Sequence, residues 1–140
     1  MSEHAFDAAI ALTGGSDNVF HGPPSPAYAN MVGPYGGITT AQALNAILQH
    51  PQRLGDPVSL TVNFCAAVAD GAFTVLARPV RTNRSTQHWT VEMAQDGQAV
   101  FTATAVTAVR RDTWSLDEEP MPRCPPPEEV PPPSVRAPMA

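Results

Sequence analysis

The chain has 140 residues, 43% of them hydrophobic and 15% charged, and its formal net charge is −5. This length suits one globular domain with a single core. All eight basic residues are arginine, and the acidic balance excludes a nucleic-acid-binding protein that relies on a positively charged surface.

The N-terminal residues carry acids ahead of an apolar run, whereas a signal peptide begins with basic residues. No apolar stretch approaches the roughly 20 residues of a membrane-spanning helix. The two cysteines, Cys65 and Cys124, lie far apart, and we interpret both as free thiols in a reducing compartment. We therefore expect a cytoplasmic protein without a nucleic-acid or membrane partner.

One helix is expected in the first half of the chain. Residues 6–22 are expected to supply one or two short strands, with Gly14 and Gly15 at their turn. Gly36 and Gly37 precede a segment, 38–50, in which apolar side chains recur at three- and four-residue spacing: Ile38, Ala41, Leu44, Ile47 and Leu48. The helix should end at His50, because the residue before a proline disfavours the α conformation. Its apolar surface is wide enough that much of the helix should be covered.

Four strands are expected to follow the helix. Residues 58–65 alternate, with one apolar face formed by Val58, Leu60, Val62 and Phe64. Residues 73–80 are rich in strand-forming residues, and Pro79 indicates an edge or a bulge. Residues 86–94 alternate again, and Asp96-Gly97 is a strong hairpin signal before the last strand, 99–109. Short reversals between four strands predict an antiparallel meander.

A helix followed by a meander predicts an α+β fold, in which a curved antiparallel sheet wraps around one central helix. Leu60, Val62 and Phe64 are expected to cover the helix, and Cys65 to behave as a small buried hydrophobe. Proteins rarely leave the edge strand of a sheet bare. We therefore expect a homo-oligomer, a dimer or a dimer of dimers, and the strand 99–109 suits the pairing.

Proline marks the end of the folded part. Nine of the 16 prolines follow Glu119, a density that no helix or central strand sustains. We assign residues 1–114 to the folded domain and 115–140 to an extended, acidic, proline-rich tail or interdomain connector. A plain linker and a docking site for a proline-binding partner both fit its PPPEEVPPP run.

The order of elements and the amino-acid sequences of three segments resemble those of a hotdog domain. More narrowly, they resemble the N-terminal half of the acyl-CoA thioesterase II-like proteins, which hold two hotdog domains in tandem. The segments are SPAYANMVGPYGGITTAQALNAI (25–47), DPVSLTVNFCAAVADG (56–71) and RPVRTNRSTQHWTVEMAQDGQAVFTATAVTAV (78–109). The resemblance implies a single hotdog fold, hydrolysis of acyl-CoA thioesters, and EEPMPRCPPPEEVPP as a connector to a second hotdog. The family's water-positioning aspartate, threonine and glutamine lie in that second half, so none is carried over to this chain.

A thioesterase needs donors that stabilise an oxyanion and a group that activates water. Gly36 and Gly37 open the helix with free backbone N–H groups, which suit an oxyanion or a phosphate. The same glycines also suit a tight turn and close contact between helix and sheet. Residues 36–50 contain no Asp or Glu, so amides are left to orient a water. The candidate catalytic residues are Gly37, Gln42 and Asn45.

The loop 81–87 is the most distinctive polar cluster. Arginine suits the phosphates of coenzyme A (CoA), and the residues just before the helix are expected to line the same groove. The predicted substrate-binding residues are Tyr28, Asn30, Tyr35, Gly36, Arg81, Arg84, Ser85 and His88. A charged reversal of the chain and packing over the helix end are the structural alternatives.

No spacing of histidines, cysteines or carboxylates indicates a metal site, and no cofactor is expected. Glu92 is a candidate base but also fits a solvated strand residue. Two functions stay open: an acyl-CoA thioesterase that acts with a second hotdog, and a non-catalytic hotdog module that binds acyl-CoA or stabilises a partner. The missing helix carboxylate favours the second, and the family resemblance favours the first. The Asp-x4-His arrangement of a hotdog hydratase is absent.

Overall fold

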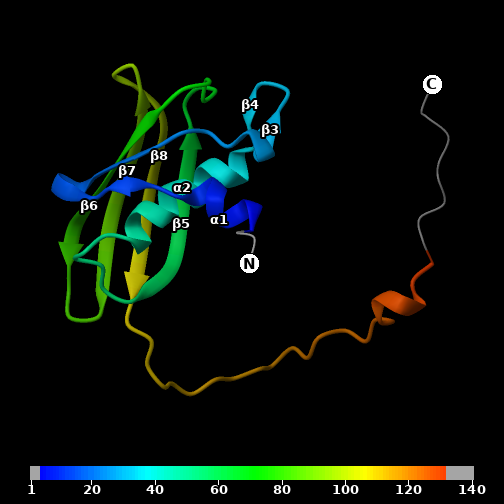
Figure 1. Ribbon diagram of the computed structural model, residues 1–140. Helices are drawn as coiled ribbons and strands as arrows, with labels where there is room; N and C mark the ends of the chain where they lie inside the picture. The colour runs from blue at the N-terminus through cyan, green and yellow to red at the C-terminus, as the bar shows by residue number, and fades with distance from the viewer. Residues whose placement is uncertain (1–3, 132–140) are drawn as a thin grey trace.

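A six-stranded antiparallel sheet curves around one long helix in the computed structural model, which describes residues 4–131 (Figure 1). The helices and strands are α1 (Ala5–Ile10), β1 (Thr13–Gly14), β2 (Val19–Gly22), β3 (Ala29–Asn30), β4 (Gly33–Pro34), α2 (Gly36–Leu48), β5 (Asp56–Phe64), β6 (Phe73–Thr82), β7 (Thr86–Gln95) and β8 (Gln98–Ala108). Short 3-10 turns occur at Ser16–Asn18, Pro26–Tyr28 and Pro127–Glu129. The α+β class, the central helix and the meander are confirmed.

The strands lie in the order β1-β2-β6-β7-β8-β5, and β3 and β4 form a separate two-stranded ribbon. The β7–β8 hairpin turns at Asp96 and Gly97, whose φ angles of 49° and 74° suit the predicted tight turn. Strand β2 covers only residues 73–76 of β6, and the register shifts between Pro79 and Arg81. Pro79 therefore lies on an open, bulged part of the strand, as its sequence predicts.

The long edge strand of the sheet is β5, the two-residue β1 being the other edge, and the pairing prediction for residues 99–109 is wrong. Strand β8 lies between β7 and β5, so both of its edges are already paired. Because β5 has a neighbour on one side only, its apolar face is incompletely covered. Leu60 and Val62 pack partly against the core as predicted, whereas Val58 is 62% and Phe64 57% exposed. The position on the edge explains why Phe64 is not buried beneath the helix.

Cys65 is exposed, so the prediction of a buried thiol is also wrong. The strand ends at Phe64, and the backbone N–H groups of Cys65 and Ala66 both donate to the Val100 carbonyl. The chain therefore bends away from the regular pleat at this point. Alternation along residues 58–65 could not reveal where the strand would end.

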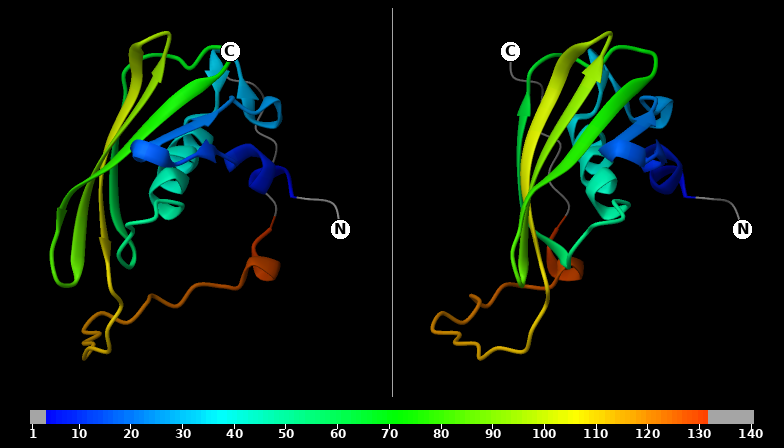
Figure 2. Two further views of the ribbon diagram at one scale, coloured as in Figure 1. Left: turned by 60° about the vertical axis from the view of Figure 1, so that its left-hand side comes forward. Right: turned by 90° about the vertical axis from the view of Figure 1, so that its left-hand side faces the viewer.

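Helix α2 is covered on two sides, which confirms the expectation of a largely buried helix. Ala43, Ala46 and Ile47 are fully buried within the core formed with the sheet, whose largest members are Phe20, Phe73, Trp89, Met93 and Phe101. The N-terminal segment covers another side of the helix, and Figure 2 shows α1 and α2 on the same face of the sheet. Strands β1 and β2 confirm the prediction for residues 6–22. The six-residue α1, capped by His4, was not predicted.

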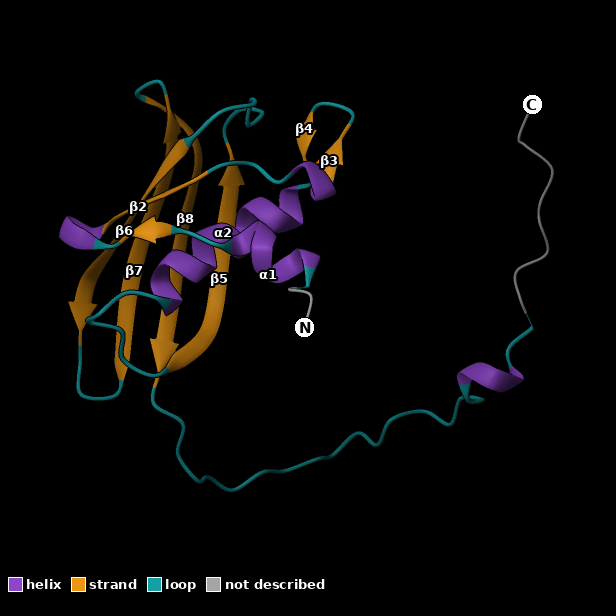
Figure 3. Cartoon of the chain, viewed as in Figure 1, coloured by secondary structure: helices purple, strands orange, loops and turns teal. Residues whose placement is uncertain are grey.

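After β8 the chain leaves the sheet. Residues 109–131 are exposed and contain only the short turn at Pro127–Glu129 (Figure 3). This agrees with an extended tail, and the boundary at residue 114 stays a prediction; residues 132–140 lie outside the described part. Within residues 4–131, the helices are too short to cross a membrane.

Candidate functional site

The first turn of α2 presents unpaired backbone donors. Tyr35 precedes the helix, and its carbonyl accepts the N–H groups of Ile38 at 3.0 Å and Thr39 at 3.5 Å. The N–H groups of Gly36 and Gly37 find no acceptor among residues 4–131. No acidic side chain occupies this turn. The positive end of the helix dipole is therefore free to bind a partial negative charge.

Two aromatic rings pack closely over the glycines at the helix start, so that a larger residue there would have to displace a ring. A Cβ at Gly36 would lie 3.0 Å from the tip of the Phe64 ring, and a Cβ at Gly37 would overlap the Tyr35 ring. Phe64 is held edge-to-face against Phe101, with ring centroids 5.5 Å apart. Glycine at these two positions therefore suits both interpretations of the sequence: it allows close packing, and it leaves the backbone N–H groups accessible.

An apolar groove begins at Gly36, the first residue of this turn. It measures about 360 Å³ and is lined by Val32, Pro34, Gly36, Thr39, Phe64, Ala66, Ala67 and Val68. Its volume lies within the range of small-molecule sites. Met31, Val32 and Tyr35, close to it in the chain, are 95%, 78% and 60% exposed. Two free N–H groups, one of them on a residue that lines an apolar groove, suit a carbonyl group that carries an apolar chain.

The amides predicted as catalytic point toward the N-terminal segment. Gln42 is 1% exposed, and its Nε2 donates to the carbonyls of Ala9 at 2.8 Å and Pro23 at 3.1 Å. Asn45 Nδ2 donates to the Ile10 carbonyl at 2.7 Å. Gln42 Oε1 is buried without a partner among the described residues. The catalytic assignment of Gly37, Gln42 and Asn45 stays a prediction, and the two amides have a second role in fastening the N-terminal segment to α2.

The predicted substrate-binding residues fall into two groups at opposite ends of the sheet. Tyr28, Asn30, Tyr35 and Gly36 lie near the start of α2, where Gly36 meets Phe64 at the end of β5. The Tyr28 carbonyl accepts the Tyr35 N–H at 2.8 Å, and Asn30 Oδ1 accepts the N–H of Met31. Arg81, Arg84, Ser85 and His88 lie at the β6–β7 hairpin, at the same end as Asp56, where β5 begins. One chain therefore does not bring the two groups together.

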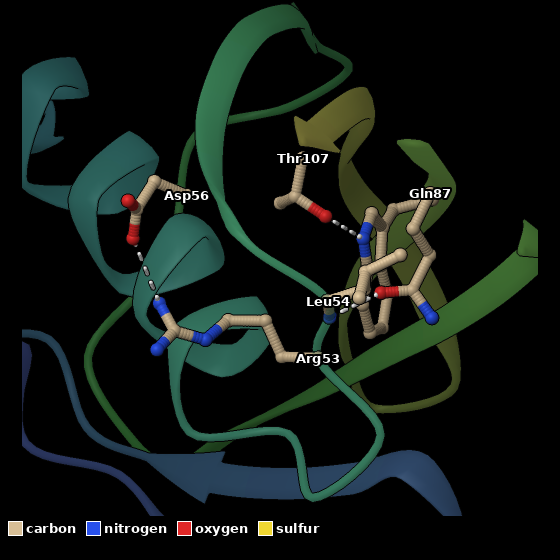
Figure 4. Close-up of polar contacts among 6 residues, drawn as sticks. Arg53, Leu54, Asp56, Gln87 and Thr107 are labelled. Carbon is tan, nitrogen blue, oxygen red and sulfur yellow. Dashed lines mark hydrogen bonds and ion pairs between the residues drawn. The ribbon is translucent and has the colours of Figure 1, made fainter. Parts of the chain in front are cut away.

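A buried glutamine that the sequence analysis missed organises the hairpin end (Figure 4). Gln87 is 1% exposed, and its Oε1 accepts the Leu54 N–H at 2.8 Å. Its Nε2 donates to the Gln52 carbonyl at 3.0 Å and to Thr82 Oγ1 at 2.8 Å. Gln87 thereby ties the loop after α2 to the hairpin. Its position two residues before Trp89, on the inward face of β7, is the signal that could have identified it.

Other titratable side chains lie away from the groove. Glu92 is exposed on β7, and His88 is exposed on the face of the sheet opposite α2. His50 is buried at the C-terminal end of α2: its Nδ1 accepts the Gln52 N–H, and its Nε2 lies 2.8 Å from Asn18 Oδ1. Burial lowers the pKa of this imidazole from 6.5. Within the described chain, no three histidines, cysteines or carboxylates are grouped to bind a metal.

The curved sheet, the wrapped helix and the groove at the helix start define a hotdog domain. Residues 25–108 match the family model of the acyl-CoA thioesterase N-terminal domain, and the chain belongs to this family.

Solved structures agree with this assignment. The chain shares 54% identity with a hotdog protein of unknown function from Alicyclobacillus acidocaldarius, with a TM-score of 0.85 over 93% of this chain and 49% of that protein. It is 20% identical to the acyl-CoA thioesterase II TesB2 of Mycobacterium marinum, with a TM-score of 0.73 over 90% of this chain and 47% of that protein. A search of curated proteins found no match. The chain thus spans about half the length of these structures.

Proposed function

We propose that this domain hydrolyses acyl-CoA thioesters in the cytoplasm when it is paired with a second hotdog, either a second copy or a following domain. The observation that carries the proposal is the pair of free N–H groups at Gly36 and Gly37, the first of which lines an apolar groove. The thioester oxygen accepts from these groups while the acyl chain lies in the groove. As water attacks the carbonyl carbon, the growing negative charge on that oxygen strengthens both hydrogen bonds.

The proposal places the water-activating group on the second hotdog. Residues 36–50 include no carboxylate, and the amides of Gln42 and Asn45, which donate to carbonyls of the N-terminal segment, cannot take a proton from water. Gly37 remains the proposed oxyanion donor on this chain. A second hotdog also has a place to bind, because β5 is a nine-residue open edge that includes the exposed Val58 and Phe64.

Pairing through β5 would unite the two groups of predicted substrate-binding residues. If two copies of β5 pair antiparallel about Leu60, the Asp56 end of one strand lies beside the Phe64 end of the other. The hairpin of one copy, with Arg81 and Arg84, is then carried toward the α2 start of its partner. A complete site in this arrangement takes the thioester from one copy and the phosphate contacts from the other.

The test is hydrolysis of an acyl-CoA panel by the purified chain, with released CoA followed by chromatography because Cys65 and Cys124 are exposed to thiol-reactive dyes. Gly37→Val, which covers the N–H groups, should abolish turnover. Gly97→Asn is the control, since nothing lies within 4 Å of its Cβ position and Asn tolerates its φ of 74°. Turnover that persists in Gly37→Val would refute the assignment of the oxyanion site.

A second function is a non-catalytic hotdog module, favoured by the absence of a carboxylate on α2. It predicts binding of acyl-CoA without turnover for every acyl chain, at all protein concentrations. If the chain showed no binding and no turnover of acyl-CoA, both functions would be refuted.

A further inference from the structure

Five of the eight arginines gather at one end of the sheet. We call this group, Arg53, Arg81, Arg84, Arg110 and Arg111, the arginine end. Its members come from three segments: the loop after α2, the β6–β7 hairpin, and the first residues after β8. All five are exposed. The lower part of Figure 1 shows the three segments converging below the sheet.

The fold fixes these segments to one another. The Val109 N–H donates to the Ser85 carbonyl at 2.9 Å, which joins the end of β8 to the hairpin. Gly55 lies so close to Ala108 that a Cβ there would overlap the Ala108 carbonyl. Gln87 holds the loop that carries Arg53 against the hairpin (Figure 4). These contacts hold the segments that carry Arg53, Arg81 and Arg84 together, and Arg110 and Arg111 directly follow the last of them, at Val109.

The arginine end is basic on an acidic chain. The three segments carry only two acids, Asp56 and Asp112, and the neighbouring turn adds Asp17. Asp56 lies 3.9 Å from Arg53, in an exposed ion pair that leaves most of the guanidinium's donors free. Five arginines thus face three acids here, in a molecule whose net charge is −5. Such a reversal of local charge favours a ligand with several negative charges close together.

We propose that the arginine end binds the diphosphate and the ribose phosphate of CoA, with Arg53, Arg110 and Arg111 joining Arg81 and Arg84. The inference rests on the proposed function and adds three residues from two further segments of the chain. Guanidinium groups bind phosphate oxygens in bidentate fashion, and five of them match a ligand with three phosphate groups. In a pair joined through β5, these arginines bind the phosphates of a CoA ester whose thioester group lies at the start of α2 in the partner. The arginine end thus selects CoA esters over thioesters that lack the nucleotide.

The experiment is calorimetric titration of the full chain with CoA and with pantetheine, which lacks all three phosphates. Wild type should bind CoA at least about tenfold more tightly, and only CoA binding should weaken with salt. The double variant Arg110→Gln/Arg111→Gln should lose about tenfold in CoA affinity with pantetheine binding unchanged, and Arg53→Gln should lose less because it is already paired. The matched control is Arg123→Gln, an exposed arginine in the tail. All these side chains are exposed, so the unfolding midpoint should not move.

Equal affinity for CoA and pantetheine, or an equal loss in Arg123→Gln, would overturn the inference. So would displacement of CoA by inorganic tripolyphosphate at equal concentration, because the site would then be a general polyanion surface. Failure of the proposed function looks different: the chain would bind CoA through these arginines and hydrolyse none of its esters. Conversely, turnover with an unchanged KM in Arg110→Gln/Arg111→Gln would preserve the function and refute the inference.

Discussion

Replacing the buried amide of Gln87 by leucine should destabilise the domain by about 3 kcal/mol. Gln87 makes three hydrogen bonds in a site that is 1% exposed, and leucine fills much of the same volume without replacing any of them. Each buried bond contributes roughly 0.5–1.5 kcal/mol, and the Leu54 N–H would be left without an acceptor. A loss of this size is a large part of the roughly 5–15 kcal/mol that stabilises a typical domain.

Urea unfolding followed by tryptophan fluorescence measures the loss, because Trp89 lies two residues away on the same face of β7. The matched control is Gln98→Leu, at the exposed start of β8, for which we expect a change within about 0.5 kcal/mol. Gln87→Leu should also weaken CoA binding by loosening the loop that carries Arg53. A loss below about 1 kcal/mol would show that the amide does not hold this end together.

Three further predictions concern other parts of the molecule. Burial lowers the pKa of His50, whereas the imidazole of the unfolded chain titrates near 6.5, so the unfolded state binds the proton first as the pH falls. The contribution of His50 to stability should therefore be complete above pH 6.5 and decline below it. In urea unfolding across the same pH range, His50→Gln should lack that decline. Gly37→Ala should displace the Tyr35 ring and reduce turnover when Tyr35 is present, but should have no further effect in a Tyr35→Ala background. Steady-state kinetics of the wild type, the two single variants and the double variant would measure this. Val58→Lys on the open edge should dissociate the paired assembly in sedimentation velocity, whereas Val80→Lys on β6, with a similar exposed fraction of 59%, should not.

Local patterns in the sequence predicted most of the fold. The spacing of apolar residues placed α2 within two residues of its observed start, and alternation with Asp96-Gly97 placed the meander. The short α1 was missed because six residues give too little periodicity, and its cap is a histidine rather than a usual capping residue. The order of the strands was not predictable in the same way. Whether residues 56–64 or 99–109 form the edge depends on long-range pairing, and both segments read as half-buried strands.

The same difference between local signals and long-range contacts applies to the candidate site. Residues with a local signal, such as Gly36 and Gly37 before a helix, lie at the helix start as expected. Gln42 and Asn45 carry a polar signal, but whether such an amide meets substrate or a backbone carbonyl depends on what covers the helix. Here the N-terminal segment supplies the carbonyls, more than 30 residues away in the chain. The eight predicted substrate-binding residues were identified as polar or conformationally special, and nothing in the sequence separates them into two ends.

The separation of those two ends argues that β5 is the centre of the functional unit. Its first residue lies at the arginine end, and its last residue contacts the start of α2. A nine-residue strand is about 30 Å long, so no single CoA phosphate group reaches the other end while its thioester stays at the helix of the same chain. An antiparallel partner removes this distance, because it reverses the direction of the second β5. Loss of pairing in Val58→Lys should therefore abolish turnover even though neither the helix start nor the arginines are altered. Full turnover by a monomeric Val58→Lys would show that one chain holds a complete site.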